Sequence, residues 1–366
     1  MKQRITCVVG TRPEVIKMAP VILALRGDPS SFDAMVLATA QHRDMLDQAL
    51  AMFGLRADVD LDLMRPDQAV GELTGRVLAG LGAYLAAHRP DAVLAQGDTT
   101  TVMATAMACF FAGIPFGHVE AGLRSFDLRA PWPEEYNRRV AAVGARWHFA
   151  PTPGAAENLR REGVGADRIF VTGNTIVDAL RHILAHTPAP PPPVPAGRPF
   201  VLMTCHRRES FGEPIRAVFR AVRDFASRHP DAVVWYPVHP NPGVRGPAAE
   251  ILGGLENVRL ADPVDYVTLL HAMKACRLVL TDSGGMQEEG VTLGKRVLVL
   301  RDVTERPEAV ESGLARLVGN DGARVAAALE QAWAESGTET AGSAVFGDGH
   351  AAGRIAGILR DQKERS

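Results

Sequence analysis

The stretch RLVLTDSGGMQEE, residues 277–289, has the pattern of a strand, a turn and a helix, and this pattern recurs along the rest of the chain. Residues 277–281 predict a buried strand, and the polar turn Thr281–Gly285 leads from it into a helical pattern. Glycines in such a turn let a phosphate approach the backbone, and the N–H groups and dipole of a helix N-terminus attract an anion. Glu289, further along the helix, can accept two hydrogen bonds from a ribose diol. The whole stretch fits a nucleoside diphosphate, whereas the turn alone is explained equally well as a plain strand-to-helix connection.

The same alternation of short apolar runs and longer amphipathic stretches continues in both directions. It predicts an α/β protein with parallel sheets that are covered by helices on both faces. The proline-rich segment 187–199 fits neither pattern and is expected to be a stiff surface segment. We therefore predict two doubly wound domains of similar size with a cleft between them. The expected strands are Arg4–Gly10, Ala34–Thr39, Ala92–Ala95, Pro115–Val119, Ile169–Thr172, Phe200–Thr204, Ala232–Val238, Val258–Ala261, Arg277–Thr281 and Arg296–Leu300. The expected helices include Glu14–Arg26, Thr99–Phe111, Pro214–Arg228 and Val264–Met273.

Composition limits the classes of partner. The chain has 366 residues and a formal net charge of −2, so it lacks the basic face that non-specific nucleic-acid binding needs. No apolar stretch reaches the roughly 20 residues that span a bilayer, and the N-terminal run is too short for a signal-peptide core. The four cysteines show no zinc spacing and are expected to be small core residues in a reducing compartment. The expected location is the cytoplasm, with no membrane partner.

Polar clusters follow many of the expected strands. In open α/β sheets, ligands bind beyond the carboxyl ends of the strands. One polar strand end is ordinary loop chemistry, but six of them, distributed over both halves, indicate one shared active site. The six are Gly10–Glu14, Gln96–Thr99, His118–Ser125, Thr204–Glu209, His239–Pro242 and Thr281–Glu289.

Cations and carboxylates at these strand ends are the candidate functional groups. Arg12 and Lys17 flank the first turn, and His206 follows an apolar run; guanidinium and imidazolium groups suit phosphate binding. Asp98 and Glu120 end apolar runs, where burial and neighbouring cations tune a carboxylate for proton transfer. Each has a plainer explanation: Asp98 would cap the next helix, and Glu134 would simply favour a helix N-terminus. The remaining candidate cations are Arg207, Arg208, Arg301 and Arg306.

Two common kinds of cofactor site are missing from the sequence. The first strand leads into VVGTRPE rather than a GxGxxG dinucleotide fingerprint. The histidines His118, His148 and His239 have neither the helical HxxxH spacing nor matching cysteines of a zinc site. We therefore expect no nicotinamide cofactor and no metal.

Taken together, the motifs resemble those of the non-hydrolysing UDP-N-acetylglucosamine 2-epimerases. The resemblance extends to about Gly319 and follows the family order, which makes the set highly specific although GTRPE or SGG alone would mean little. The matching segments are GTRPEVIKMAP, TAQHRDML, QGDTTT, HVEAGLRS, PWPEEYNRR, TGNTIVDAL, HRRES, YPVHPNP, TDSGGMQEE and VLRDVTERPEAV.

The resemblance implies a GT-B-type fold of two Rossmann-like domains, residues 1–172 and 173–351, with a C-terminal helix 352–366 that packs back on the first. It implies a homodimeric enzyme of cell-surface polysaccharide biosynthesis that binds UDP-N-acetylglucosamine and UDP. Some bacterial members bind a second substrate molecule as activator, but Asp44 and Asp67 replace Gln and Arg of that site and are expected to weaken it. The residues that look catalytic are Asp98, Glu120, Glu134 and His206. Those that look like substrate, phosphate or regulatory contacts are Arg12, Lys17, Gln41, Gln68, Arg138, Arg207, His239, Ser283, Gly284, Gly285, Glu289 and Arg306.

Three alternatives stay open at this point. A hydrolysing 2-epimerase would release free N-acetylmannosamine, although PWPEEYNRR looks more like the non-hydrolysing branch. A GT-B glycosyltransferase would need an acceptor, and the sequence shows no apolar docking stretch for a lipid one. A sensor of nucleotide sugars without catalysis is disfavoured by the presence of all three carboxylates and His206.

Overall fold

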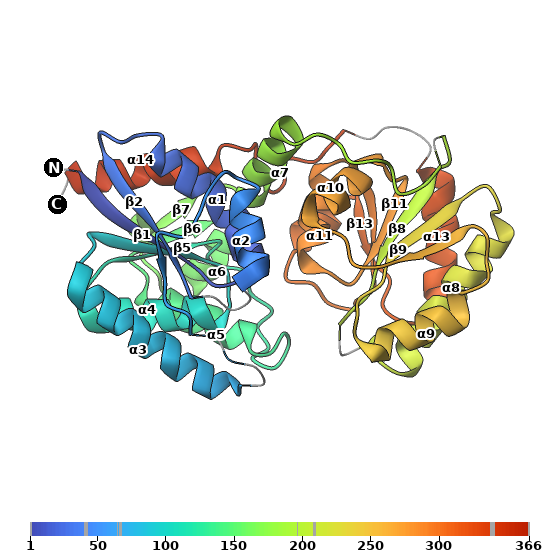
Figure 1. The fold of residues 1–366 in the computed structure, drawn as a ribbon, viewed down its shortest axis with the longest axis horizontal. Helices are drawn as coiled ribbons and strands as arrows, with labels where there is room; N and C mark the ends of the chain where they lie inside the picture. Colours follow the sequence, from blue (N-terminus) through green and yellow to red (C-terminus); the bar gives the residue numbers. More distant parts are fainter. Residues whose placement is uncertain are drawn as a thin grey trace. The chain divides into compact units, whose positions relative to one another are not determined.

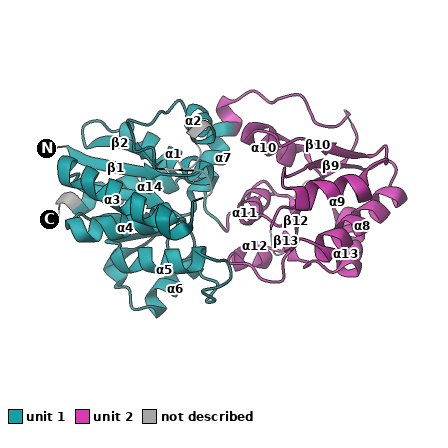
Figure 2. Cartoon of the chain, turned by 60° about the horizontal axis from the view of Figure 1, so that its bottom comes forward, with its two compact units in different colours: residues 1–183, 346–366 teal, residues 184–345 magenta. Residues whose placement is uncertain are grey.

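The computed structural model describes residues 2–39, 43–63, 65, 68–195, 197–207, 210–336 and 341–364. The chain forms two compact units, Met1–Ile183 with Phe346–Ser366, and Leu184–Val345 (Figure 2). The division falls within helix α7 (Thr175–His186), between Gly173 and the proline-rich segment. Each unit has its own sheet and its own helices, so each is described by itself.

Unit 1 contains a parallel sheet with seven strands among the described residues, in the order β3-β2-β1-β4-β5-β6-β7. The order reverses between β1 and β4, which are paired in register from Ile5 opposite Ala92 to Cys7 opposite Leu94. Helices α3, α4 and α5 cover one face, and α1, α2 and α14 cover the other (Figure 1). The strands are β1 (Gln3–Val9), β2 (Phe32–Ala38), β3 (Val59–Asp60), β4 (Ala92–Gln96), β5 (Phe116–Val119), β6 (Trp147–Ala150) and β7 (Ile169–Val171). The helices are α1 (Arg12–Arg26), α2 (Arg43–Ala51), α3 (Val70–His88), α4 (Thr100–Ala112), α5 (Glu134–Gly144), α6 (Pro153–Arg161), α7, and α14 (Ala351–Glu364).

The last helix returns to unit 1 and is fixed there by several contacts. It packs against α1, and its first two backbone N–H groups, at Ala351 and Ala352, donate to the Asp178 carboxylate on α7. Arg354 donates to the carbonyl of Thr172 over 3.0 Å. The carboxylate therefore occupies the position of an N-cap for a helix that is far away in sequence.

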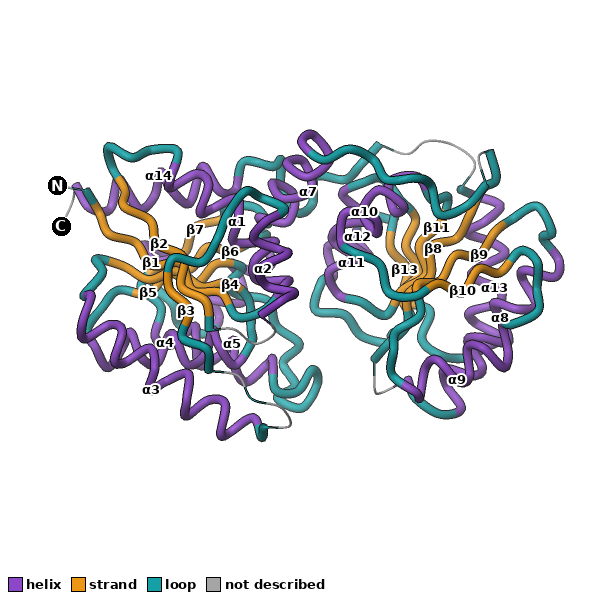
Figure 3. Tube along the Cα trace, in the orientation of Figure 1, coloured by secondary structure: helices purple, strands orange, loops and turns teal. Residues whose placement is uncertain are grey.

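Unit 2 repeats the arrangement with six strands among its described residues, in the order β10-β9-β8-β11-β12-β13 (Figure 3). The reversal here lies between β8 and β11, where the paired residues Thr204 and Thr281 also join their hydroxyl groups at 2.7 Å. The strands are β8 (Phe200–Thr204), β9 (Val233–Pro237), β10 (Val258–Ala261), β11 (Leu278–Thr281), β12 (Arg296–Val299) and β13 (Ala315–Leu317). The helices are α8 (Glu213–Arg228), α9 (Pro242–Leu252), α10 (Tyr266–Ala275), α11 (Gly284–Thr292), α12 (Pro307–Glu311) and α13 (Gly322–Glu335).

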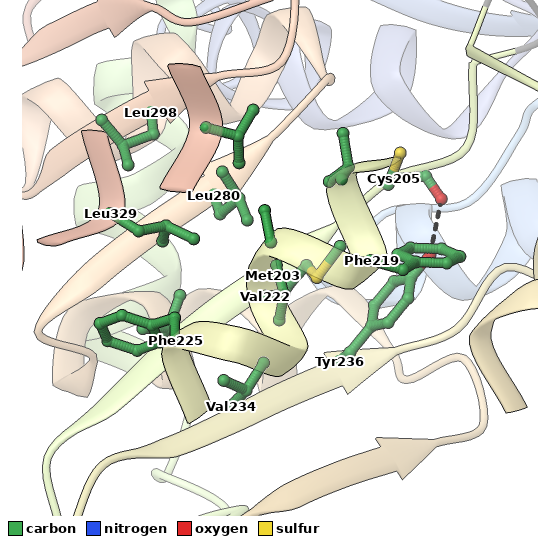
Figure 4. Close-up of a cluster of buried hydrophobic side chains, with 14 of the residues drawn as sticks. Met203, Cys205, Phe219, Val222, Phe225, Val234, Tyr236, Leu280, Leu298 and Leu329 are labelled. Carbon is green, nitrogen blue, oxygen red and sulfur yellow. Dashed lines mark hydrogen bonds between the residues drawn. The ribbon is translucent and has the colours of Figure 1, made fainter. Parts of the chain in front are cut away.

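The core of unit 2 supports the loop that follows β8. Phe219 of α8 packs against Tyr236, and Phe225 of the same helix belongs to the same apolar cluster (Figure 4). The buried Tyr236 hydroxyl donates to the carbonyl of Cys205 over 2.9 Å. The close-packed core thereby fixes the backbone one residue before His206.

The α/β class and the parallel sheets are confirmed. Every strand expected from the sequence is present with ends within two residues of the prediction, and the expected helices are present as α1, α4, α8 and α10. Three short strands were not predicted: β3, β6 and β13. The suggestion that Asp98 caps α4 was wrong, because Thr99 is the N-cap and its hydroxyl accepts from the N–H of Val102. The four cysteines are buried free thiols. None of the described helices is long and apolar enough to cross a bilayer.

Candidate active site

The loops after β1 and β4 of unit 1 meet at the point where the strand order reverses, and Glu14 joins them. Its Oε2 accepts from the N–H groups of Gly10 and Thr11, each over 2.6 Å, and Thr11 in turn caps α1. Its other oxygen accepts from the hydroxyl of Thr99. Burial raises the pKa of Glu14 to about 7, against the opposing effect of these hydrogen bonds. Glu14 thus ties the Arg12 turn to the Asp98 loop.

Asp98 follows β4 and is held from two sides by α5. The guanidinium of Arg138 donates to its carboxylate, and the Asn137 side chain donates to its backbone carbonyl over 2.9 Å. The Asp98 side chain is 29% exposed, whereas Arg138 is buried and also reaches the fully buried Glu135 at 3.3 Å. The carboxylate therefore points outward from a rigid cationic support.

His118 on β5 also supports the loop that follows β4. Its Nε2 donates to the carbonyl of Gly97 over 2.7 Å, so the neutral ring carries its hydrogen on that nitrogen. Burial lowers the pKa of His118 to about 4 and that of its cross-strand neighbour His148 to about 3. His118 is therefore a neutral hydrogen-bond donor near pH 7.

Lys17 and Glu120 form the second charged pair of unit 1. The ammonium of Lys17, one turn into α1, donates to Glu120 at the end of β5, and both side chains are almost completely buried. Glu120 has a φ of 64°, in the left-handed region that few non-glycine residues adopt. A strained position with a buried ion pair is typical of a functional site.

The remaining candidates of unit 1 lie outside these two charged pairs. Glu134 is the first residue of α5, one turn before Arg138, and Arg12 is an exposed first residue of α1. Gln68 accepts a hydrogen bond from Arg76 of α3. Gln41 lies outside the described residues.

In unit 2 the loops after β8 and β11 meet in the same way, and a buried carboxylate again joins them. Asp282 Oδ2 accepts from the N–H groups of His206 and Arg207 over 2.6 and 2.8 Å. Its Oδ1 lies 3.1 Å from Nδ1 of His206. Burial by itself would raise the pKa of Asp282, but the hydrogen bonds and charge of His206 lower it overall. His206 also stacks on His239 with ring centroids 5.6 Å apart.

The N-terminus of α11 begins directly after Asp282. Ser283 is its N-cap residue but makes no side-chain cap, and Gly284 lies so close to Arg306 that a Cβ there would be 2.7 Å from Nη1. Arg306 is held by Glu288 over 2.6 Å and Glu305 over 2.7 Å. This helix terminus has backbone N–H groups and an adjacent guanidinium, which is the chemistry of an anion site.

Glu289 lies on the same helix, close to Gly285. A Cβ built on Gly285 would be 4.0 Å from Oε1 of Glu289. The Oε1 atom accepts from the hydroxyl of Tyr266 over 2.7 Å, and both residues are buried. The carboxylate is therefore fixed in orientation. Within the described part of the chain, no group of three or more His, Cys, Asp or Glu could hold a metal ion.

Comparison with known proteins decides the family. The family model described as UDP-N-acetylglucosamine 2-epimerase matches residues 24–360. This chain belongs to the UDP-N-acetylglucosamine 2-epimerase family. It is 46% identical to the UDP-N-acetylglucosamine 2-epimerase of Escherichia coli K12 over 373 aligned residues, which cover 98% of this chain and 99% of the relative.

Solved structures of epimerases agree in fold over the whole chain. The Neisseria meningitidis UDP-GlcNAc 2-epimerase bound to UDP-GlcNAc is 40% identical with a TM-score of 0.92, covering 98% of this chain and 100% of that one. The S. aureus MnaA–UDP co-structure is 39% identical with a TM-score of 0.89, covering 100% of this chain and 97% of that one.

For this epimerase-family chain, the structure brings the predicted residues together as two separate sets. Asp98 is paired with Arg138 and Lys17 with Glu120 in unit 1; His206 with His239, and Gly284 with Arg306, lie together in unit 2. Sequence reasoning assigned no role to Glu14, Asp282 or Tyr266. The Thr11-x-x-Glu14 spacing is a capping-box signal that points to the first. The position of Asp282 directly after an apolar strand was a weaker signal, and nothing in the sequence linked Tyr266 to Glu289.

Proposed function

We propose that this chain interconverts UDP-N-acetylglucosamine and UDP-N-acetylmannosamine without hydrolysis, by eliminating UDP to give 2-acetamidoglucal and adding it back. The observation that carries the proposal is the chemical difference between the two sets of strand-end residues. Unit 2 offers a helix N-terminus, His206 and Arg306 for an anion, and unit 1 offers Asp98 and Glu120 for proton transfer.

The chemistry requires the two steps in this order. C2 of the sugar bears the nitrogen of the acetamido group, and neither neighbouring ring carbon is a carbonyl. The hydrogen on C2 is therefore not acidic enough for direct removal. When the bond between C1 and the phosphate oxygen breaks, its electron pair leaves with UDP and C1 gains oxocarbenium character. The C2 proton then becomes acidic, and its removal leaves the double bond of 2-acetamidoglucal.

Departure of UDP places negative charge on the β-phosphate, which needs preorganised donors. In this proposal the N-terminus of α11 at Ser283 and Gly284 holds the diphosphate, and Arg306, locked by two carboxylates, keeps its guanidinium beside it. His206 donates to the leaving oxygen, Arg12 adds a further cation, and Glu289 binds the ribose hydroxyls.

A carboxylate takes the C2 proton, and a proton returned to the opposite face completes the inversion before UDP adds back to C1. Asp98 and Glu120 suit this role because each is fixed by a buried cation. Glu134, at the start of α5, is the third candidate, since inversion needs proton donors and acceptors on both faces.

The test is an NMR time course with UDP-N-acetylglucosamine in deuterated water. We expect UDP-N-acetylmannosamine with deuterium at C2, and an unchanged rate after exhaustive chelation and removal of nicotinamides. Free N-acetylmannosamine as the main product would identify a hydrolysing enzyme instead. Product without deuterium at C2, or a strict need for metal or nicotinamide, would contradict the elimination route.

A further inference from the structure

Asp282 is a fully buried charged group at the proposed UDP site, and the elimination route gives it no step. Its side chain is fully buried, directly ahead of the N-cap of α11. The backbone N–H groups of His206 and Arg207 donate to its Oδ2, and Nδ1 of His206 approaches its Oδ1 to 3.1 Å, which is an ion-pair distance. His206, by contrast, is 41% exposed in its side chain. The carboxylate therefore lies behind the imidazole, on the side away from solvent.

We propose that Asp282 is a positioning residue that holds His206 with its hydrogen on Nδ1 and turns Nε2 toward the departing phosphate. A carboxylate oxygen has lone pairs and no hydrogen, so its approach to 3.1 Å favours the tautomer in which Nδ1 carries the hydrogen. Nε2 is then the nitrogen that gives and takes the proton at the leaving oxygen.

The surroundings of the pair fix this arrangement further. The Cys205 carbonyl is anchored by the Tyr236 hydroxyl, so the backbone leading into His206 is rigid. On the open side, the His206 ring stacks on His239, whose own Nδ1 accepts from the N–H of Asn241 over 3.2 Å. Because its Nδ1 accepts a hydrogen bond, the His239 ring is neutral in this arrangement, and burial lowers the pKa of His239 in the same direction.

The inference rests on the proposed function, because it assumes that His206 acts on the leaving group. It adds a carboxylate that acts only through His206. The aspartate that orients the histidine of a serine protease has a comparable role, and there the exchange of Asp for Asn keeps the geometry and lowers turnover by about 10⁴-fold. Asp282→Asn should behave alike: the amide oxygen still accepts from the two backbone N–H groups, while its NH₂ faces Nδ1 and forces that nitrogen to accept.

The experiment combines two measurements on the full chain. In native protein labelled with ¹⁵N-histidine, we expect the His206 signal to show a protonated Nδ1, and in Asp282→Asn the neutral ring should switch to the other tautomer. The kcat of Asp282→Asn should fall by roughly 10²-fold or more with a smaller change in KM. Asp231→Asn is the matched control, because Asp231 is exposed and precedes β9 at the opposite end of the sheet; its kcat should stay native.

A double-mutant cycle separates positioning from a purely structural role. If Asp282 acts through His206, Asp282→Asn should cost almost nothing further in a His206→Gln background. Additive losses, a native kcat in Asp282→Asn, or an unprotonated Nδ1 in the native protein would each overturn the inference, and the last result does not depend on any variant folding. A fully active His206→Gln would instead overturn the role of His206 in the proposed function.

Discussion

Each unit joins its two loops at the sheet reversal with one buried carboxylate, but the two carboxylates differ in what they hold. Glu14 in unit 1 accepts only from uncharged donors, two backbone N–H groups and a threonine hydroxyl, and burial raises its pKa to about 7. Asp282 in unit 2 accepts from two backbone N–H groups and lies 3.1 Å from an imidazole nitrogen, and its pKa is lowered in spite of burial. The two carboxylates bridge equivalent pairs of loops, Glu14 from the β1 side and Asp282 from the β11 side, and their pKa values shift in opposite directions because only Asp282 lies beside an imidazole.

Exposure shows a second inversion between the units. In the Asp98–Arg138 pair of unit 1 the cation is buried, at 4% exposure, and the carboxylate faces outward. In the Asp282–His206 pair of unit 2 the carboxylate is buried and the imidazole faces outward. In each pair the outward member is the group that the proposed chemistry needs, a base for the sugar and a proton donor for the phosphate. The buried member supplies orientation.

The largest effect should come from removing the outward base of unit 1. Asp98→Asn keeps the volume but cannot accept a proton, so kcat and deuterium entry at C2 should fall by about 10²–10⁴-fold. Asp91→Asn is the control, because Asp91 is exposed at the other end of the same strand. NMR of C2 exchange measures both. Native exchange in Asp98→Asn, Glu120→Gln and Glu134→Gln alike, with exchange abolished by Lys17→Ala, would make the lysine the base in place of these carboxylates.

Removing the buried cation of the same pair should lower stability. Arg138→Met leaves the fully buried Glu135 with less counter-charge and Asp98 without its support, which should cost about 3–5 kcal/mol of unfolding free energy. Arg139→Met is the matched variant, because Arg139 reaches the same Glu135 but is 37% exposed, so it should cost about 1 kcal/mol or less. Denaturant titration measures both. Equal losses would show that burial of the cation does not distinguish the two arginines.

The opposite pKa shifts predict opposite pH dependences. The folded-state pKa of Glu14, about 7, exceeds its ordinary value of 4.5, so the stability it contributes is present at low pH and is lost as the pH rises through about 7. The loss should approach about 3 kcal/mol. Asp282, with its lowered pKa, loses stability only when the pH falls. Denaturation of the native chain and Glu14→Gln between pH 5 and 8 should give diverging curves, since glutamine does not titrate. Parallel curves would mean that Glu14 does not change charge in this range.

The sequence predicted the two doubly wound units well because their strands are apolar and their loops polar. It failed at strands that are very short or interrupted by a polar residue: β3 has only Val59 and Asp60, β6 contains the buried His148, and β13 has three residues with Arg316 in the middle. Burial of a histidine or the pairing of a two-residue edge strand is decided by the neighbouring strands. A local pattern does not contain that information.

For the site, the sequence indicated which loops contribute but not which carboxylates act as supports. Asp98 and His206 were candidates by residue type and position, whereas Glu14 and Asp282 stood in the same loops without a role. Their importance comes from pairing two loops that are 85 residues apart in one case and 76 in the other. Such contacts follow from the reversal of strand order, and a single sequence shows that reversal only indirectly.

The smallest effect concerns the threonine that completes the unit 1 connection. Thr99 caps α4 through Val102 and donates to Glu14, so Thr99→Val removes both contacts at nearly constant volume. We expect a loss of about 1 kcal/mol, whereas Thr99→Ser, which keeps the hydroxyl, should stay within a few tenths of native. Thermal unfolding measures the stability, and the same samples give kcat, which should fall less in Thr99→Val than in Asp98→Asn because the base itself is intact. If Thr99→Val were as stable as Thr99→Ser, the threonine hydroxyl would not support this helix, and the separation of supporting and outward residues in unit 1 would have to be redrawn.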